Sequence, residues 1–155
     1  MMNAEEKSKY YLEAKQEIQS VLENVTDEIA CMATISCLLH QKFDYYFWTG
    51  FYRLHKPDEL IIGPYQGTLG CLFIKVGNGV CGTAALKRET VIVPDVHEFP
   101  GHIACDSRSN SEIVVPVFNK SDHLIAVFDV DSTEFGAFDE VDQTHLEDLL
   151  TIFRK

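Results

Sequence analysis

The chain has 155 residues, of which 46% are hydrophobic and 11% aromatic, a composition that can fill one hydrophobic core and argues against disorder. Its formal net charge of −11 repels phosphate groups, and no cluster of Lys or Arg offsets that charge, so neither nucleic acid nor an anionic membrane is an expected partner. The N-terminal segment lacks the apolar core of a signal peptide, and no apolar run approaches the ~18 residues of a membrane span. We therefore expect a cytoplasmic protein with a single domain over residues 1–155.

Two amphipathic helices are predicted at the start of the chain, within about residues 5–40. In the first, apolar residues recur at three- and four-residue intervals over about residues 5–24, and in the second they do so after a cap at Thr26 or Asp27. The first helix could mediate a homodimer if its apolar face is not covered within the chain. Two cysteines fall in the second helix and are interpreted as core residues: Cys31 and Cys37.

A β-hairpin is predicted next. The run from Phe43 to Leu54 is dense in aromatic residues and indicates a strand, and Glu59 to Pro64 runs back after a turn. Side chains of a strand repeat every second residue, so Trp48 and Tyr52 share one face. These two rings fit either an ordinary core or the wall of a pocket. Gly50 between them indicates a bulge or a close approach of the neighbouring backbone.

The segment from Gly63 to Gly82 is punctuated by glycines. It carries neither the Lys-Ser/Thr pair of a P-loop nor the spacing of a dinucleotide site, so no phosphate site is expected. Val80 to Lys87 is typical of a short helix with Cys81 in its first turn. Because the N-terminus of a helix carries a partial positive charge, this position predicts a lowered pKa for the Cys81 thiol.

A short strand, Thr90–Val93, leads into a long loop over about Val96 to Asn110. Loops longer than ~12 residues inside a compact domain are commonly functional. This loop concentrates polar and reactive side chains: His97, His102, Cys105 and Arg108.

The five cysteines are interpreted as buried, reactive or metal-bound thiols, because persistent disulfides are rare in a reducing compartment. Tetrahedral zinc ligands could come from Cys71, Cys81, Cys105, His97 and His102. No Cys-x-x-Cys pair is present, however, so we expect neither a metal nor another cofactor.

A second hairpin is predicted from residues 112–118 and 124–130. Counting back from its turn sets Glu112 opposite Asp129 and places Asp131 two residues further along the same face. A slip of one residue would turn Glu112 to the other face, so the prediction depends on the register. Crowded carboxylates need a bound cation or retained protons, which fits either a bound ammonium group or a carboxyl that donates a proton. The alternative is a solvated acidic edge.

A last amphipathic helix is predicted after a cap at Phe138-Asp139. The order helix, helix, hairpin, glycine-rich segment, short helix, strand, hairpin, helix favours an α+β domain. In such a domain an antiparallel sheet carries the helices packed on it.

Several blocks of the sequence belong to one recognisable pattern. They are Trp48-Thr49-Gly50-Phe51-Tyr52, Gly63-Pro64-Tyr65-Gln66-Gly67, the spaced cysteines Cys71, Cys81 and Cys105, Ser111-Glu112-Ile113-Val114-Val115-Pro116, and Phe128-Asp129-Val130-Asp131-Ser132. Together, over nearly the whole chain, they resemble the free methionine-R-sulfoxide reductases built on a GAF domain. The resemblance implies a GAF-like fold and reduction of free methionine-R-sulfoxide to methionine. It also implies a cysteine sulfenic acid, an intramolecular disulfide, and thioredoxin as the reductant.

The resemblance also implies the roles of the cysteines. Cys105 matches the catalytic cysteine, and Cys71 and Cys81 match the resolving pair. We take Cys71 as the first choice for the resolving thiol and Cys81 as the second. Sequence separation does not decide between them, because the fold sets the distance between sulfurs.

The remaining site residues follow from the same resemblance. Glu112, Asp129 and Asp131 match the acids that hold the ammonium and sulfoxide groups of the substrate, and Trp48 and Tyr52 match the aromatic residues around its methyl end. A protonated Glu112 or Asp131 would supply a proton to the departing oxygen. The competing interpretations are a GAF module that senses a ligand or redox state without turnover, and a thiol peroxidase.

Overall fold

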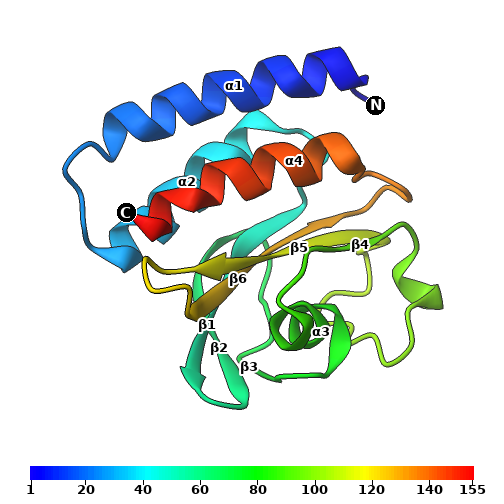
Figure 1. Ribbon diagram of the computed structural model, residues 1–155. Coiled ribbons are helices and arrows are strands. Elements are labelled where there is room, and N and C mark those ends of the chain that lie inside the picture. Colours follow the sequence, from blue (N-terminus) through cyan, green and yellow to red (C-terminus); the bar gives the residue numbers. More distant parts are fainter.

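The computed structural model describes all 155 residues and has one antiparallel sheet with helices on both faces (Figure 1). The strand order across the sheet is β3-β2-β1-β6-β5-β4. The strands are β1 Trp48–Lys56, β2 Glu59–Gln66, β3 Phe73–Lys75, β4 Val91–Val93, β5 Ser111–Phe118 and β6 Leu124–Ser132. The helices are α1 Ala4–Val21, α2 Glu28–Lys42, α3 Gly79–Lys87 and α4 Glu140–Leu149, with short 3₁₀ segments at Val96–Glu98 and Leu150–Arg154. The expected α+β class with an antiparallel sheet is confirmed.

The sheet separates two hydrophobic clusters. Helices α2 and α4 cover one face, α1 packs on the outside of these two helices, and α3 alone covers part of the other face (Figure 1). Alternate residues of each strand serve the two clusters, so that Phe128 of β6 packs under the helical layer and Val127 packs toward α3. The smaller cluster under α3 leaves room at its edge for polar side chains, which is where the candidate site lies.

The predicted apolar face of α1 is buried inside the chain. Tyr11, Ala14 and Ile18 are each only 1% exposed, and Tyr11 packs on Phe43 with ring centroids 4.3 Å apart. The condition for a dimer through this face is therefore not met, and the oligomeric state stays a prediction.

A buried polar network ties α1 to α4 and to the segment before β1. Asp142 is 0% exposed and accepts hydrogen bonds from Lys7 Nζ at 2.6 Å, Tyr11 Oη at 2.7 Å and Tyr45 Oη at 2.6 Å. The hydroxyl of Tyr46 lies 2.7 Å from that of Tyr11. Such a network is stable only when every member is paired, and here both oxygens of Asp142 are paired.

Two differences from the predicted elements concern β1 and β3. The aromatic run predicted as strand from Phe43 becomes a strand only at Trp48, because Phe43, Tyr45 and Tyr46 turn into the helical core instead. The short edge strand β3 was not predicted, since it falls inside the glycine-punctuated segment.

The register of the last hairpin differs by two residues from the predicted one. Glu112 pairs with Asp131 rather than with Asp129, and Asp129 pairs with Val114. One residue of the difference arises at the turn, because Phe118 pairs with Leu124 and not with His123, and the other arises at an irregularity of the ladder between Val117 and Phe118. Because the difference is an even number, all three acids remain on the predicted face.

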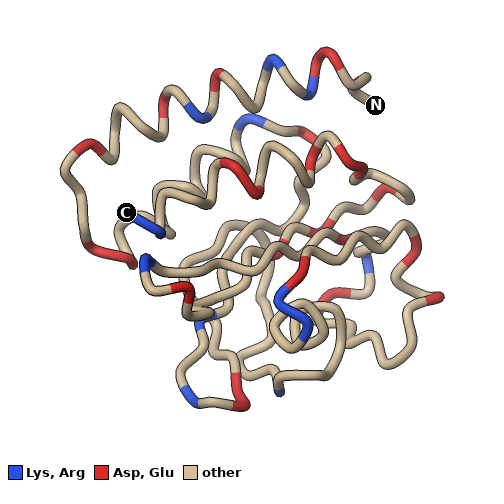
Figure 2. Tube along the Cα trace, viewed as in Figure 1, with Lys and Arg blue, Asp and Glu red and all other residues tan.

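Charged residues are spread along the chain. Figure 2 shows Lys and Arg scattered, singly or in the adjacent pairs Lys87-Arg88 and Arg154-Lys155, among more numerous Asp and Glu. None of the helices combines the length and the apolar character that a bilayer crossing demands.

Candidate active site

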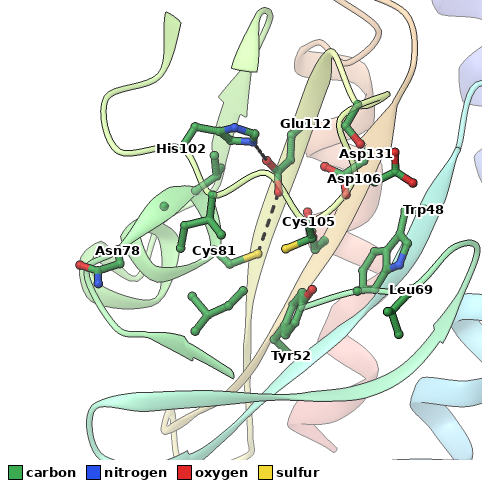
Figure 3. A pocket seen from close by; sticks show the side chains of 17 residues that line it. Trp48, Tyr52, Leu69, Asn78, Cys81, His102, Cys105, Asp106, Glu112 and Asp131 are labelled. Carbon is green, nitrogen blue, oxygen red and sulfur yellow. Dashed lines mark hydrogen bonds and ion pairs between the residues drawn. The ribbon is translucent and has the colours of Figure 1, made fainter. Parts of the chain in front are cut away.

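A pocket lies between the sheet and α3, under two loops (Figure 3). It contains all but one of the residues predicted for the site, and the exception, Cys71, is bonded to a residue that lines it. The lining residues are Trp48, Tyr52, Leu69, Gly70, Ile74, Asn78, Gly79, Val80, Cys81, His102, Ile103, Cys105, Asp106, Ser109, Glu112, Asp129 and Asp131.

Strand pairing places the acids and the tryptophan in adjacent rows of the sheet. Trp48 of β1 lies opposite Asp131 of β6, which in turn lies opposite Glu112 of β5. Asp129 occupies the next row on the same face, opposite Gly50. The three carboxyl groups therefore gather because the neighbouring strands β5 and β6 bring them to one end of the sheet, where β1 adds Trp48.

Burial raises the pKa of these three carboxyl groups. Glu112 and Asp129 are only 5% and 4% exposed. Loss of hydration raises the pKa of each well above its usual range, and the neighbouring carboxylate raises it further. The pKa of Asp131 is also raised, by burial first and then by Asp129. Oδ1 of Asp129 has no hydrogen-bond partner, so the cluster holds an unused acceptor at the pocket.

An aromatic wall closes the other side of the pocket. The ring of Trp48 stacks on Tyr52 with centroids 5.5 Å apart and on Tyr65 with centroids 5.1 Å apart, and its Nε1 donates to the carbonyl of Thr68 at 2.8 Å. A Cβ on Gly70 would lie 2.9 Å from Cζ2 of Trp48, so glycine at this position lets the loop pass close to the fixed ring. The prediction that Trp48 and Tyr52 share a face is confirmed.

Two loops are joined over the pocket by a disulfide between Cys71 and Cys105, whose Cα atoms are 5.4 Å apart. Next to it, Thr68 Oγ1 donates to Asp106 at 2.8 Å. Arg108 holds the same carboxylate through its backbone N–H and its guanidinium, which lowers the pKa of Asp106 well below its usual range. The loop after Val96 is thus fixed to the loop after β2 by one covalent bond and one hydrogen bond.

Cys81 does not behave as its position at the start of α3 suggested. Its side chain is buried, and loss of hydration, followed by the charge of Asp129, raises the pKa of the thiol well above its usual range. The Sγ atom lies 4.0 Å from Oε2 of Glu112 (Figure 3). The predicted lowering of this pKa is therefore wrong, because desolvation and nearby acids outweigh the partial charge of a short helix.

His102 is a pocket residue to which the sequence assigned no such role. Its Nε2 lies 3.7 Å from Oε1 of Glu112 (Figure 3), and burial lowers the pKa of its ring. The sequence named it as a polar residue of the long loop and as one of several possible zinc ligands, but not as a neighbour of Glu112, since nothing in a loop pattern indicates which strand it contacts. His97 of the same loop lies outside the pocket, where its Nε2 is 3.0 Å from Oδ1 of Asn110.

Comparison with known proteins agrees with this geometry. The family described as "GAF domain" matches residues 15–153. The chain is 42% identical to GAF domain-containing protein A of Dictyostelium discoideum, over 94% of this chain and 91% of that protein. It is 40% identical to the free methionine-R-sulfoxide reductase of Escherichia coli, over 96% of this chain and 89% of that protein.

A solved structure gives the same result. The free methionine-R-sulfoxide reductase of Neisseria meningitidis in complex with its substrate superposes with a TM-score of 0.91 at 43% identity, covering 96% of this chain and 88% of that one. The chain belongs to the GAF-domain family, in the branch that contains the free methionine-R-sulfoxide reductases.

Proposed function

We propose that this chain is a thiol-dependent oxidoreductase that reduces free methionine-R-sulfoxide to methionine, within one domain spanning residues 1–155. The observation that carries the proposal is the Cys71–Cys105 disulfide next to a pocket with a carboxyl cluster on one side and an aromatic wall on the other. The relatives named above supply the reaction and the epimer.

The carboxyl cluster suits the ammonium group of a free amino acid. Asp129 offers a buried oxygen without a hydrogen-bond partner, and Glu112 and Asp131 stand in the adjacent row. An ammonium group supplies three N–H donors and a positive charge, which offsets the crowding of the carboxyl groups. Trp48 and Tyr52 then flank the S-methyl end of the same molecule.

The chemical step pairs a thiolate with an acid. The Cys105 thiolate attacks the sulfoxide sulfur, and Glu112 or Asp131, whose raised pKa keeps a proton on the carboxyl, protonates the oxygen. The S–O bond of the sulfoxide breaks and its oxygen, carrying the added proton, passes to the Cys105 sulfur as the bond between the two sulfurs breaks. Methionine leaves, and Cys105 becomes a sulfenic acid. A second thiol displaces water from this sulfenic acid and forms a disulfide.

Cys71 is the resolving thiol in this scheme. Its bond to Cys105 is the product that resolution would give, and it supports the first choice made from the sequence. Cys81 remains a buried free thiol among the acids.

The pocket of the disulfide form is small. Its cavity measures about 40 Å³, which is room for a few water molecules. Reduction of Cys71–Cys105 removes the covalent bond between the two loops, so that the long loop can move as a lid. Cys105 is exposed and Cys71 half-buried, which leaves the bond within reach of a dithiol protein such as thioredoxin in the cytoplasm.

Turnover with a modified substrate tests the proposal. We expect thioredoxin-coupled reductant consumption with free methionine-R-sulfoxide and at least about a tenfold lower kcat/KM with its N-acetyl derivative, which lacks the ammonium charge. The S epimer and hydrogen peroxide serve as controls. Equal rates with the N-acetyl compound would remove the acids from substrate binding. Binding of the free compound without turnover would instead identify a sensor module.

A further inference from the structure

Three side chains with metal-ligating atoms converge in the pocket from three different elements. Cys81 comes from α3, Glu112 from β5 and Asp129 from β6, and one ligand atom of each lies within 4.8 Å of the other two. All three side chains are buried, at 5%, 5% and 4% exposure. The proposed reaction uses the two acids for substrate but gives Cys81 no step.

A second observation points to a cation among these donors. Oδ1 of Asp129 is buried and has no hydrogen-bond partner. A buried polar atom without a partner is unfavourable by about 1–3 kcal/mol. A cation bound in the pocket would pair this oxygen directly.

The donor set selects the class of cation. One sulfur and two carboxylate oxygens are a mixed set that suits Zn²⁺ and its heavier analogue Cd²⁺, whereas Mg²⁺ and Ca²⁺ prefer oxygen alone. With bonds of ~2.0–2.3 Å, a tetrahedral zinc ion holds its donors roughly 3.5 Å apart. The observed separations of up to 4.8 Å therefore need to shrink by about 1 Å.

The surroundings match an open catalytic-type geometry with three protein ligands. The cavity of about 40 Å³ has room for an ion and a water in the fourth position. His102 Nε2 lies 3.7 Å from Oε1 of Glu112, while Oε2 of the same carboxyl faces Cys81 (Figure 3).

We propose that the disulfide form of this protein binds one Zn²⁺-class ion through Cys81, Glu112 and Asp129, with a water as fourth ligand. Binding displaces the protons of the thiol and the carboxyl groups into solvent. The ion occupies the same carboxyl groups as the ammonium site of the proposed function, on which this part rests, so it must leave before the reduced enzyme binds substrate.

Cadmium binding to the disulfide form tests this proposal without any turnover assay. In that form Cys81 is the only free thiol at the pocket, because Cys71 and Cys105 are bonded to each other. We expect one equivalent of Cd²⁺ to bind chelator-treated protein, with the ultraviolet absorption of a cadmium–thiolate bond, and Zn²⁺ to displace it.

Matched variants locate the site. Cys81→Ser should abolish the absorption, and Asp129→Asn should weaken binding at least about tenfold. The double variant Cys31→Ser/Cys37→Ser should bind as the wild type does, since both thiols lie outside the pocket. Thermal unfolding checks that each variant folds, and Cys81→Ala replaces Cys81→Ser if it does not. Unchanged absorption without the Cys81 thiol, or no binding to the wild type, would overturn the proposal.

Discussion

Cys105→Ser lowers the turnover of free methionine-R-sulfoxide by at least about a thousandfold in the proposed scheme. A serine hydroxyl at this position is a far weaker nucleophile than a thiolate, so the covalent step fails. The loop carrying Cys105 is also fixed by the Thr68–Asp106 hydrogen bond, which the substitution leaves intact. Loss of activity would therefore report chemistry rather than misplacement of the loop.

Two companion variants sharpen this prediction. Cys37→Ser removes a thiol on α2 outside the pocket and should keep wild-type turnover. Cys71→Ser should allow one turnover and then stop, because the sulfenic acid on Cys105 has lost its partner. Retention of steady-state activity by Cys105→Ser would remove Cys105 as the nucleophile and make Cys81, the remaining pocket thiol, the next candidate.

Asp142→Ala lowers the free energy of unfolding by about 3–5 kcal/mol, the typical loss when one partner of a buried ion pair is removed. The change leaves Lys7, which is 2% exposed, with weaker partners and strips Tyr11 and Tyr45 of their common acceptor. It also removes the carboxylate that accepts from the Asp139 backbone N–H at the start of α4. Urea unfolding followed by circular dichroism measures the loss.

Asp148→Ala is the matched control for this prediction. Asp148 lies on the same helix and pairs with Lys15 of α1 at 2.5 Å, but its side chain is 54% exposed. Exposed pairs contribute about 0–1 kcal/mol, so this variant should unfold close to the wild type. Similar losses for Asp142→Ala and Asp148→Ala would show that the buried network does not stabilise the fold.

The sequence was sufficient to predict which side of the sheet each side chain of the last hairpin faces, but not which residues pair across it. Alternation along the last hairpin correctly put Glu112, Asp129 and Asp131 on one side of the sheet. A register difference of two residues does not change which side a side chain faces. The pairing of Glu112 with Asp131 depends both on the length of the turn, which pairs Phe118 with Leu124, and on the irregularity between Val117 and Phe118, and alternation of apolar residues reports neither.

The environment of Cys81 could not be predicted from its neighbours in the chain. Local reasoning considered only the start of α3, whereas the groups that raise the pKa of this thiol come from β5 and β6. His102 illustrates the same limit, since its contact with Glu112 depends on the path of a long loop. Which sulfur bonds to Cys105 likewise depends on three dimensions, because the loops over the pocket set which sulfurs meet.

The most direct measurement is a single turnover without reductant. Fully reduced protein is incubated anaerobically with one equivalent of free methionine-R-sulfoxide, the released methionine is counted, and the disulfides are mapped by peptide mass spectrometry. The proposed mechanism predicts one methionine per chain, a disulfide between Cys71 and Cys105, and Cys81 still as a thiol. Methionine formation with Cys105 still unmodified, or no methionine at all, would contradict it.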